Sequence, residues 1–193
     1  IQGRYAYIID GIAPATSNFK IMDVSNPSTP ALVGTLIFGT NPSGTTPTSI
    51  FVAGRYAYVV DSISDDLKVI DVSNPTTPVT VGTLAIGGGP KSIAVAGRYA
   101  YVVDEVSNDL KVIDVSNPIS PALSNSFTVG GTPYYVTIAG RYAYVVDAGG
   151  DRDLRIIDIS NPVTPVLVGS KVFSVGGLVT VAVSGRYAYV LNA

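Results

Sequence analysis

The sequence predicts an all-β protein, a β-propeller of about four four-stranded antiparallel blades, with an incomplete N-terminal blade and surplus C-terminal strands. The five-residue word Gly-Arg-Tyr-Ala-Tyr begins at residues 3, 54, 97, 140 and 185, with spacings of 51, 43, 43 and 45. A second word, Asp-(Val/Ile)-Ser-Asn-Pro, begins at residues 23, 71, 114 and 158. Gly and Pro recur too often for helices, and β-branched and aromatic residues fill the intervals. A period in the forties is typical of blades, so we treat residues 1–193 as one propeller or propeller segment.

The first half of each repeat predicts two buried strands. In the repeat from 91 to 131, residues 91–96 form a short run of larger and smaller apolar residues, typical of a buried strand. After a turn at Gly97, residues 98–104 place their two tyrosines on one face and Ala100 and Val102 on the other. Both faces are apolar, which indicates a sheet covered on both sides.

The second half of the repeat predicts a third strand and an outer strand. Residues 110–116 form the third strand, which Asn-Pro ends because proline has no N–H to donate. Pro121 opens the fourth strand, residues 122–129. A proline at this place in every repeat indicates an edge strand, where a missing donor is tolerated. Four short strands joined by tight turns predict an antiparallel blade.

The third strand carries a family resemblance. Its sequence in the reference repeat, Leu-Lys-Val-Ile-Asp-Val-Ser-Asn-Pro at 110–118, resembles the motif of LVIVD repeat proteins, and so do residues 19–27, 67–75 and 154–162. The resemblance covers almost the whole chain. It implies a β-propeller, usually in bacterial or archaeal surface or secreted proteins, most of them without an assigned biochemistry. It therefore indicates the fold strongly and the function weakly.

The ends of the chain do not match in strand number. Complete blades are expected at 48–87, 90–131 and 133–175. The N-terminal part supplies only second, third and fourth strands, whereas the C-terminal part supplies an inner strand, 178–184, and a further second strand, 186–191. A four-bladed ring could close with 178–184 inside the N-terminal strands. The last strand would then be displaced, begin a further blade, or pair with another copy.

Composition excludes several classes of function. The chain has no Cys and no His, so disulfides, thiol nucleophiles, Cys/His metal sites and His-based triads are ruled out. Only 13 % of residues are charged, the net charge is −2, and no basic cluster predicts nucleic-acid binding. No apolar run approaches the ~20 residues of a membrane helix. Low charge together with abundant Thr, Ser, Val and Tyr favours an extracellular or cell-surface protein. The missing initiator Met indicates a processed chain or a segment of a longer one.

The loops after the second strands are acidic and give two interpretations. Oxygen ligands at close spacing could hold Ca²⁺, although the spacing does not match an EF-hand. The alternative is that these side chains form turns and face solvent. We expect no cofactor, with Ca²⁺ as the one exception. The loop residues are Asp61, Asp65, Asp66, Asp104, Glu105, Asp109, Asp147, Asp151 and Asp153.

The repeated arginine and tyrosines also have structural and functional interpretations. The arginines could form an anion-binding ring, or each could pair with a repeated aspartate, of the set 71, 114 and 158 or of the set 61, 104 and 147. The tyrosine pairs could stack on sugars, but packing between blades explains their recurrence better. Tyr134 and Tyr135 depart from the repeat and are the candidates for a blade-specific contact.

The function expected from these observations is structural and non-enzymatic. Low charge, similar blades and an unpaired end strand predict a surface protein that associates head to tail with its own copies, with surface glycans as a further partner. The candidate assembly strands contain Arg4, Tyr5, Tyr7, Arg186, Tyr187 and Tyr189. The alternative is a ligand- or glycan-binding module that is a segment of a larger propeller.

Overall fold

The computed structural model describes residues 2–10, 17–39, 47–149, 152–173 and 176–192, which form seventeen strands in five antiparallel sheets. The first sheet has three strands: β1 (Tyr5–Asp10), β2 (Ser17–Asp23) and β3 (Ala31–Gly39). The second contains β4 (Pro47–Ala53), β5 (Tyr56–Asp61), β6 (Asp66–Asp71) and β7 (Val79–Ala85). The third contains β8 (Pro90–Ala96), β9 (Tyr99–Asp104), β10 (Asp109–Asp114) and β11 (Ala122–Thr128). The fourth contains β12 (Pro133–Ala139), β13 (Tyr142–Asp147), β14 (Asp153–Asp158) and β15 (Val166–Val172), and the fifth only β16 (Leu178–Ser184) and β17 (Tyr187–Asn192).

Each repeat forms one sheet in sequence order, which confirms the predicted blade. β9 pairs on one side with β8 and on the other with β10. The turn at Gly97 has a positive φ of 59°, which glycine adopts at little cost. The third strand ends at Asp114 rather than Ser116, because the Asp114 carboxylate accepts a hydrogen bond from the Ser116 N–H at 2.9 Å and turns the chain.

The core lies between neighbouring sheets. The tyrosine face of β5, with Tyr58 and Val60, packs against Ala100 and Val102 of β9 in the next sheet. The same contact recurs where Tyr101 meets Ala143 and Val145. Because the tyrosines of each sheet fill the space beside the small residues of the next, the repeated tyrosines act in packing between blades, as the sequence indicated.

A second contact joins the outer strands to the next sheet. A Cβ on Gly82 of β7 would fall on the carbonyl oxygen of Pro118, in the Asn-Pro turn between β10 and β11. Gly34 of β3 has the same relation to Pro75. The Asn-Pro word therefore ends a strand and also packs against the preceding blade.

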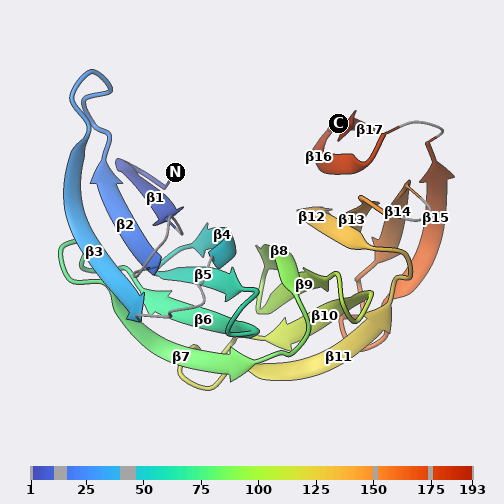
Figure 1. Ribbon diagram of the computed structural model, residues 1–193, viewed down its shortest axis with the longest axis horizontal. Helices are drawn as coiled ribbons and strands as arrows, with labels where there is room; N and C mark the ends of the chain where they lie inside the picture. The colour runs from blue at the N-terminus through green and yellow to red at the C-terminus, as the bar shows by residue number, and fades with distance from the viewer. Residues whose placement is uncertain (1, 11–16, 40–46, 150–151, 174–175, 193) are drawn as a thin grey trace.

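The five sheets form an open arc rather than a closed ring. Figure 1 shows the first strand of each sheet toward the concave side, with the two chain ends on opposite sides of the opening. β16 pairs with β17, and no pairing joins it to β1 within the described strands. The four-bladed closure considered above is therefore wrong, and so is a displaced last strand. The N-terminal blade is incomplete and the C-terminal strands are surplus, as predicted.

Candidate functional site

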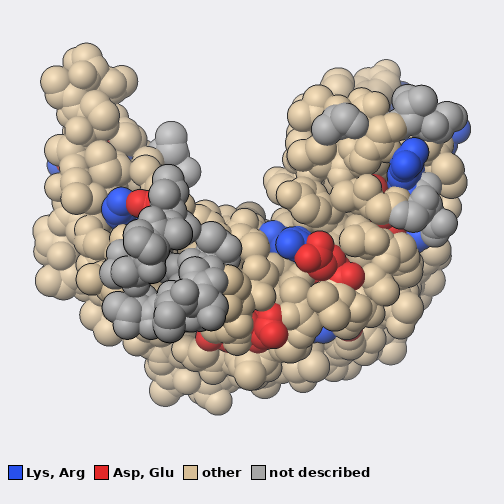
Figure 2. All heavy atoms as spheres, viewed as in Figure 1, with Lys and Arg blue, Asp and Glu red and all other residues tan. Residues whose placement is uncertain are grey.

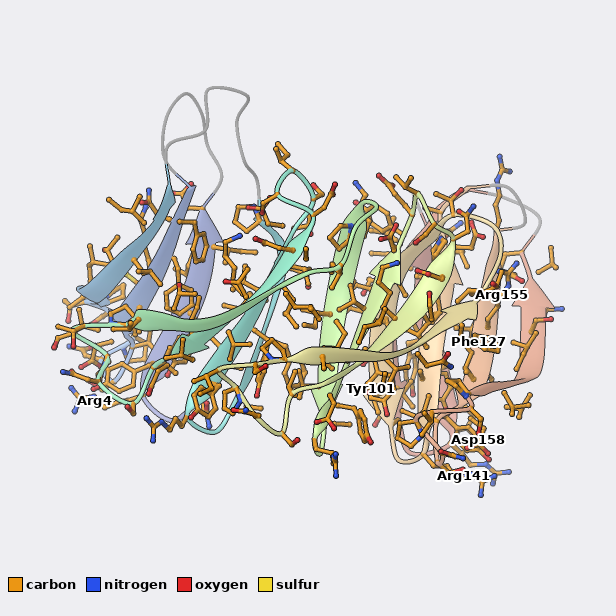
Figure 3. All side chains as sticks on the ribbon, turned by 90° about the horizontal axis from the view of Figure 1, so that it is seen from below. Arg4, Tyr101, Phe127, Arg141, Arg155 and Asp158 are labelled. Carbon is orange, nitrogen blue, oxygen red and sulfur yellow. The ribbon has the colours of Figure 1, made fainter. Side chains whose placement is uncertain are left out.

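One edge of the arc carries the repeated arginines, and their role there is structural. Each arginine of the first four repeats pairs with the aspartate at the end of the third strand of its own sheet; Arg141 Nη2 lies 2.6 Å from Asp158 Oδ2. Figure 3 shows Arg4, Arg141 and Asp158 at this edge, which we call the arginine edge. The other pairs are Arg4–Asp23, Arg55–Asp71 and Arg98–Asp114. The sequence allowed two sets of aspartates as partners of the arginines, and the structure shows that the set at the ends of the third strands, residues 71, 114 and 158, forms the ion pairs.

The ion pairs at the arginine edge hold the aspartates in their charged form. Hydrogen bonds from Arg98, and then from Ser116, lower the pKa of Asp114 to about 2. The same causes lower the pKa of Asp71 and of Asp23 to about 2. Each arginine is occupied by its carboxylate and stacks beside its neighbouring tyrosine ring, as Arg98 does over Tyr99 at 5.3 Å. An anion-binding ring is therefore not formed here.

The acidic loops lie at the opposite edge, and their buried aspartates shape turns. Asp104 is fully buried, and its Oδ1 accepts hydrogen bonds from the N–H groups of Gly89, Val106 and Ser107, each at 3.0 Å. Burial opposes its ionisation, but the hydrogen bonds from Ser107 and Gly89 and the charge of Lys111 lower the pKa of Asp104 overall. Each such aspartate ties its own loop together, as the turn-forming interpretation expected. The expectation that these side chains face solvent is wrong for Asp61, Asp104 and Asp147, which are buried.

Metal binding by these loops has no geometric support in the part of the chain that the structure describes. No group of three or more acidic side chains converges there on one point. Asp151, one of the residues considered for calcium, lies outside the described residues. The Ca²⁺ site stays a prediction.

A β-bulge at the start of every inner strand distinguishes the same edge. The register of β4 with β5 shifts between Pro47 and Ser49, so Thr48 is an extra residue without a partner in the ladder. The shift recurs in β8, β12 and β16. A bulge re-aims a side chain and interrupts the sheet, and bulges are frequent beside active sites. We call this side of the arc the bulge edge, and the bulge residues are Thr48, Lys91, Tyr134 and Val179.

The bulge residues differ in chemistry although the strands around them repeat. Thr48 is a hydroxyl whose Oγ1 donates to the carbonyl oxygen of Pro90 in the next sheet at 2.7 Å. Lys91 Nζ lies 2.8 Å from Glu105 Oε1, and both side chains are partly exposed. Tyr134 is 40 % exposed and Val179 36 %. Four equivalent backbone positions therefore present a hydroxyl, an ion pair, an aromatic ring and an aliphatic group.

Charged side chains gather beside the concave rim of the bulge edge. Figure 2 shows blue and red atoms together over β8 and the connection from β9 to β10, in the middle of the arc. A second ion pair, Lys20–Asp10 at 2.6 Å, belongs to the first sheet. Smaller groups of charged atoms lie elsewhere on this face (Figure 2).

A hollow of about 330 Å³ lies along the inner strands. Three sheets supply most of its wall, through β4, β8 and β12, and Ile9 of β1 completes it. Its polar lining includes the side chains of Thr48, Ser49, Tyr135 and Thr137. Ser49 Oγ also accepts a hydrogen bond from the Ile93 N–H at 3.3 Å, which holds β4 against β8. The hollow has the size of a small-ligand site.

The sequence candidates separate in the structure. Tyr134 belongs to the bulge edge, whereas Tyr135 lines the hollow and packs against the cluster of Val146, Leu154, Leu178 and Val181. Of the candidate assembly residues, Tyr5 and Tyr7 pack inside the first interface, whereas Tyr187 and Tyr189 are 63 % and 60 % exposed. The two arginines among these candidates flank the same strands: Arg4 directly precedes β1, and Arg186 lies in the turn between β16 and β17.

Sequence reasoning missed Thr48, Lys91, Glu105 and Val179 as members of one site. The signal was present, because the residue after the first position of each inner strand changes in every repeat while its surroundings recur. This variation alone did not indicate a site, because only the register shift in the structure shows that the variable residue has no partner in the neighbouring strand.

Comparison with family models decides the family. The LVIVD repeat model matches residues 1–37, 45–85, 87–129, 130–171 and 176–192. The chain belongs to the LVIVD repeat family. A search of curated protein sequences finds no match.

Solved structures share the fold at low sequence identity. A protein from Lactobacillus plantarum superposes with a TM-score of 0.85 at 14 % identity, over all of this chain and 62 % of its own. A putative 6-phosphogluconolactonase from Bacteroides uniformis gives 0.83 at 14 %, over 98 % and 61 %. The periplasmic gluconolactonase of Pseudomonas aeruginosa gives 0.82 at 17 %, over 98 % and 60 %. The LVIVD chain thus spans about 60 % of the length of these structures.

These similarities correct the expectation of a non-enzymatic structural protein that assembles head to tail. Proteins named as lactonases carry the same arrangement of blades along the whole chain, so similar blades and an open end strand are no ground for excluding catalysis. The expectation failed because the repeated residues reflect how the blades pack on one another. A catalytic site would depend on the few positions that differ between repeats, which that expectation did not use. Identities of 12–17 % show the fold alone.

Across the described residues, no helix has the length and apolar character needed to cross a membrane.

Proposed function

We propose that this LVIVD chain is part of a β-propeller hydrolase that opens a small polyhydroxylated lactone at the bulge edge. The observation that carries the proposal is the set of four different side chains on equivalent bulges, one of which, Thr48, also lines a hollow of small-ligand size. Equivalent positions whose chemistry differs between similar blades are candidates for specificity, and a bulge re-aims the side chain at such a position.

The Lys91–Glu105 pair supplies the chemistry. Lactone hydrolysis adds water to the carbonyl carbon, breaks the bond from that carbon to the ring oxygen, and leaves a hydroxy acid. Glu105 takes a proton from the attacking water and returns one to the departing ring oxygen. The Lys91 ammonium stabilises the negative oxygen that develops on the carbonyl. Their separation of 2.8 Å keeps both groups at one point of the bulge edge.

Neighbouring bulges position the substrate. The exposed ring of Tyr134, on the inner strand next to β8, offers an apolar face for the C–H face of a sugar and a hydroxyl at its tip. Thr48 and Thr137 bring hydroxyl groups to the wall of the hollow. These residues fit a polyhydroxylated ligand, the class that the names of the lactonase structures indicate.

We further propose that the protein works outside the cytoplasm, at the cell surface or in an extracellular compartment. The low charge and the abundance of Thr, Ser, Val and Tyr fit such a location, and one structural neighbour is named as periplasmic. Surface glycans stay a predicted partner, as ligands of the same tyrosine.

The test is lactone hydrolysis by the purified chain, followed by acid release against a buffer blank. We expect gluconolactone or 6-phosphogluconolactone to open faster with protein than without. Glu105→Gln should lower kcat by about 10²–10⁴-fold, because the general base is lost. Asp10→Asn, which removes the Lys20–Asp10 ion pair of the first sheet, is the matched control and should leave the rate unchanged. A rate equal to the blank, or an unaffected Glu105→Gln variant, would overturn the proposal.

A further inference from the structure

The outer strands of the first two sheets contain a glycine because the next sheet fills the space where a side chain would be. Gly34 pairs with Ile21 and Gly82 with Val69, each just before a register shift between the third and fourth strands. A Cβ at either position would fall on a proline carbonyl of the next Asn-Pro turn. The glycine therefore marks a place where a neighbouring turn packs.

Gly169 of β15 occupies the equivalent position, but nothing described packs there. It pairs with Ile156 just before the same kind of register shift. The nearest atom to a Cβ at Gly169 would be Ile156 Cδ1 at 4.0 Å, an ordinary contact within its own sheet. Its φ is not positive either, so the backbone does not require glycine. The glycine is unexplained by the described residues alone.

The surface around Gly169 is a blade interface without its second half. Val168, directly before this glycine, is 54 % exposed. Its counterparts Val33 and Val81 pack against the cores formed with the next sheet. The face of β15 thus carries apolar residues like those buried between the other blades, but here they are exposed to solvent.

The fifth sheet lacks the strands that would cover this face. β9 pairs with both β8 and β10, whereas β17 pairs only with β16 within the described strands. In the second and third sheets, the third strand leads into the Asn-Pro turn that covers the glycine of the preceding sheet. One missing element therefore accounts for the open edge of β17 and for the bare face of β15.

We propose that the edge of β17 and the face of β15 together bind a hairpin of the third and fourth strands of an LVIVD repeat, with its Asn-Pro turn over Gly169. The hairpin completes the fifth blade by continuing the contact already made by Gly34 and Gly82. This inference concerns the C-terminal end of the arc and is independent of the lactone site.

The third strand of a folded second copy cannot take this place. Each third strand of the described sheets, including β2, already pairs on both sides, so none is free to add to β17. The occupant must be a hairpin that is not yet part of a sheet, such as further repeat sequence. The structural neighbours agree with a longer ring. Seventeen strands here match 62 % of the Lactobacillus protein, so that chain has room for about 27 such strands (17 divided by 0.62), about seven blades.

The experiment appends a second copy of residues 105–129 after Ala193. This segment holds the loop, the third strand, the Asn-Pro turn and the fourth strand of the third repeat. We expect hydrogen exchange of the β17 amides to slow at least tenfold and Tm to rise by several degrees. An extension of the same composition in scrambled order is the control. Unchanged exchange in β17 would overturn the proposal.

Gly169→Val distinguishes docking over the glycine from unspecific pairing. In the parent chain it should shift Tm by no more than about 1 °C, because the space is open. In the extended chain it should remove at least half of the gain in Tm and in β17 protection. Equal effects in the two chains would show that no turn packs on Gly169.

Analytical sedimentation of the parent chain tests whether a second copy of the chain occupies this surface instead. We expect a monomer of 20.0 kDa at micromolar concentration. A dimer whose formation protects the β17 amides would place a second copy on this edge and overturn the proposal.

Discussion

The third sheet, β8–β11, and the fifth sheet, β16–β17, contain the same words but have opposite environments. Both begin with a bulged inner strand and turn through a glycine with φ of 59° into a second strand. Tyr101 in the third sheet is 2 % exposed, whereas its equivalent Tyr189 in the fifth is 60 % exposed. Burial also raises the pKa of the Tyr101 hydroxyl to about 12.

The comparison separates what a repeat does alone from what its neighbours do. Backbone pairing between the inner and second strands is local, and it is complete in both sheets. Burial of the tyrosine needs the Ala and Val face of the next blade, which only the third sheet has. Stability in such an array therefore arises largely at the interfaces between units.

The largest expected effect comes from truncating the two tyrosines. Tyr101→Ala should lower the free energy of unfolding by about 3–5 kcal/mol, because it empties a filled interface between the third and fourth sheets. Tyr189→Ala should change it by less than about 0.5 kcal/mol, because that ring faces solvent. Urea unfolding measures both. Similar losses would mean that the fifth sheet packs in solution against something the arc does not contain.

A smaller contrast is expected at the outer-strand glycines. Gly82→Ala should destabilise the chain by about 1–3 kcal/mol, because its Cβ meets the Pro118 carbonyl and the two blades must separate. Gly169→Ala should be neutral or slightly stabilising, because alanine restricts the unfolded chain and meets no obstacle. Thermal melts of the two variants test this, and a destabilised Gly169→Ala variant would contradict it.

Acid should weaken the first three sheets and leave the fifth unaffected. The pKa values of Asp23, Asp71 and Asp114 are about 2 in the folded chain, against about 3.9 in an unfolded one. The unfolded state binds more protons between these values, so this stabilisation is complete well above pH 4 and is lost as pH falls from about 4 to 2.

Hydrogen exchange against pH, measured sheet by sheet, checks this prediction. Within the described strands, Arg186 of the fifth sheet has no third strand beside it, so no equivalent carboxylate is expected to titrate there. Stability that increased on acidification from pH 4 would show the opposite sign and refute the assignment.

The smallest effect is expected from the arginines themselves. Arg98→Met should lower Tm by no more than about 2 °C, because the side chain is largely exposed and a surface ion pair contributes little. The pKa of Asp114 should move up toward its ordinary value, which NMR titration can follow. Arg186→Met is the matched control and should change neither quantity.

Much of the fold could be predicted from the sequence, and less of the candidate site. The spacing of the repeated words, the alternating tyrosines and the Asn-Pro stops predicted where each sheet lies in the sequence. This was possible because the strands of a meander pair with their sequence neighbours, and because Gly, Asn and Pro mark the turns between them. Tyr134 was found because it departs from the repeat. Lys91 and Glu105 were not joined, because Lys91 lies in β8 and Glu105 in the loop after β9, and their contact depends on the bulge.

By itself, the sequence determined the repeat, the antiparallel blade, the family and the exclusion of Cys- and His-based chemistry. These depend on residue type and spacing within about forty positions. Tertiary structure alone decided which aspartates pair with the arginines, which side chains the bulges turn outward, and that the blades form an open arc. Those outcomes depend on how one blade packs on the next, and a small rotation at each interface, repeated along the chain, is not encoded in any single repeat.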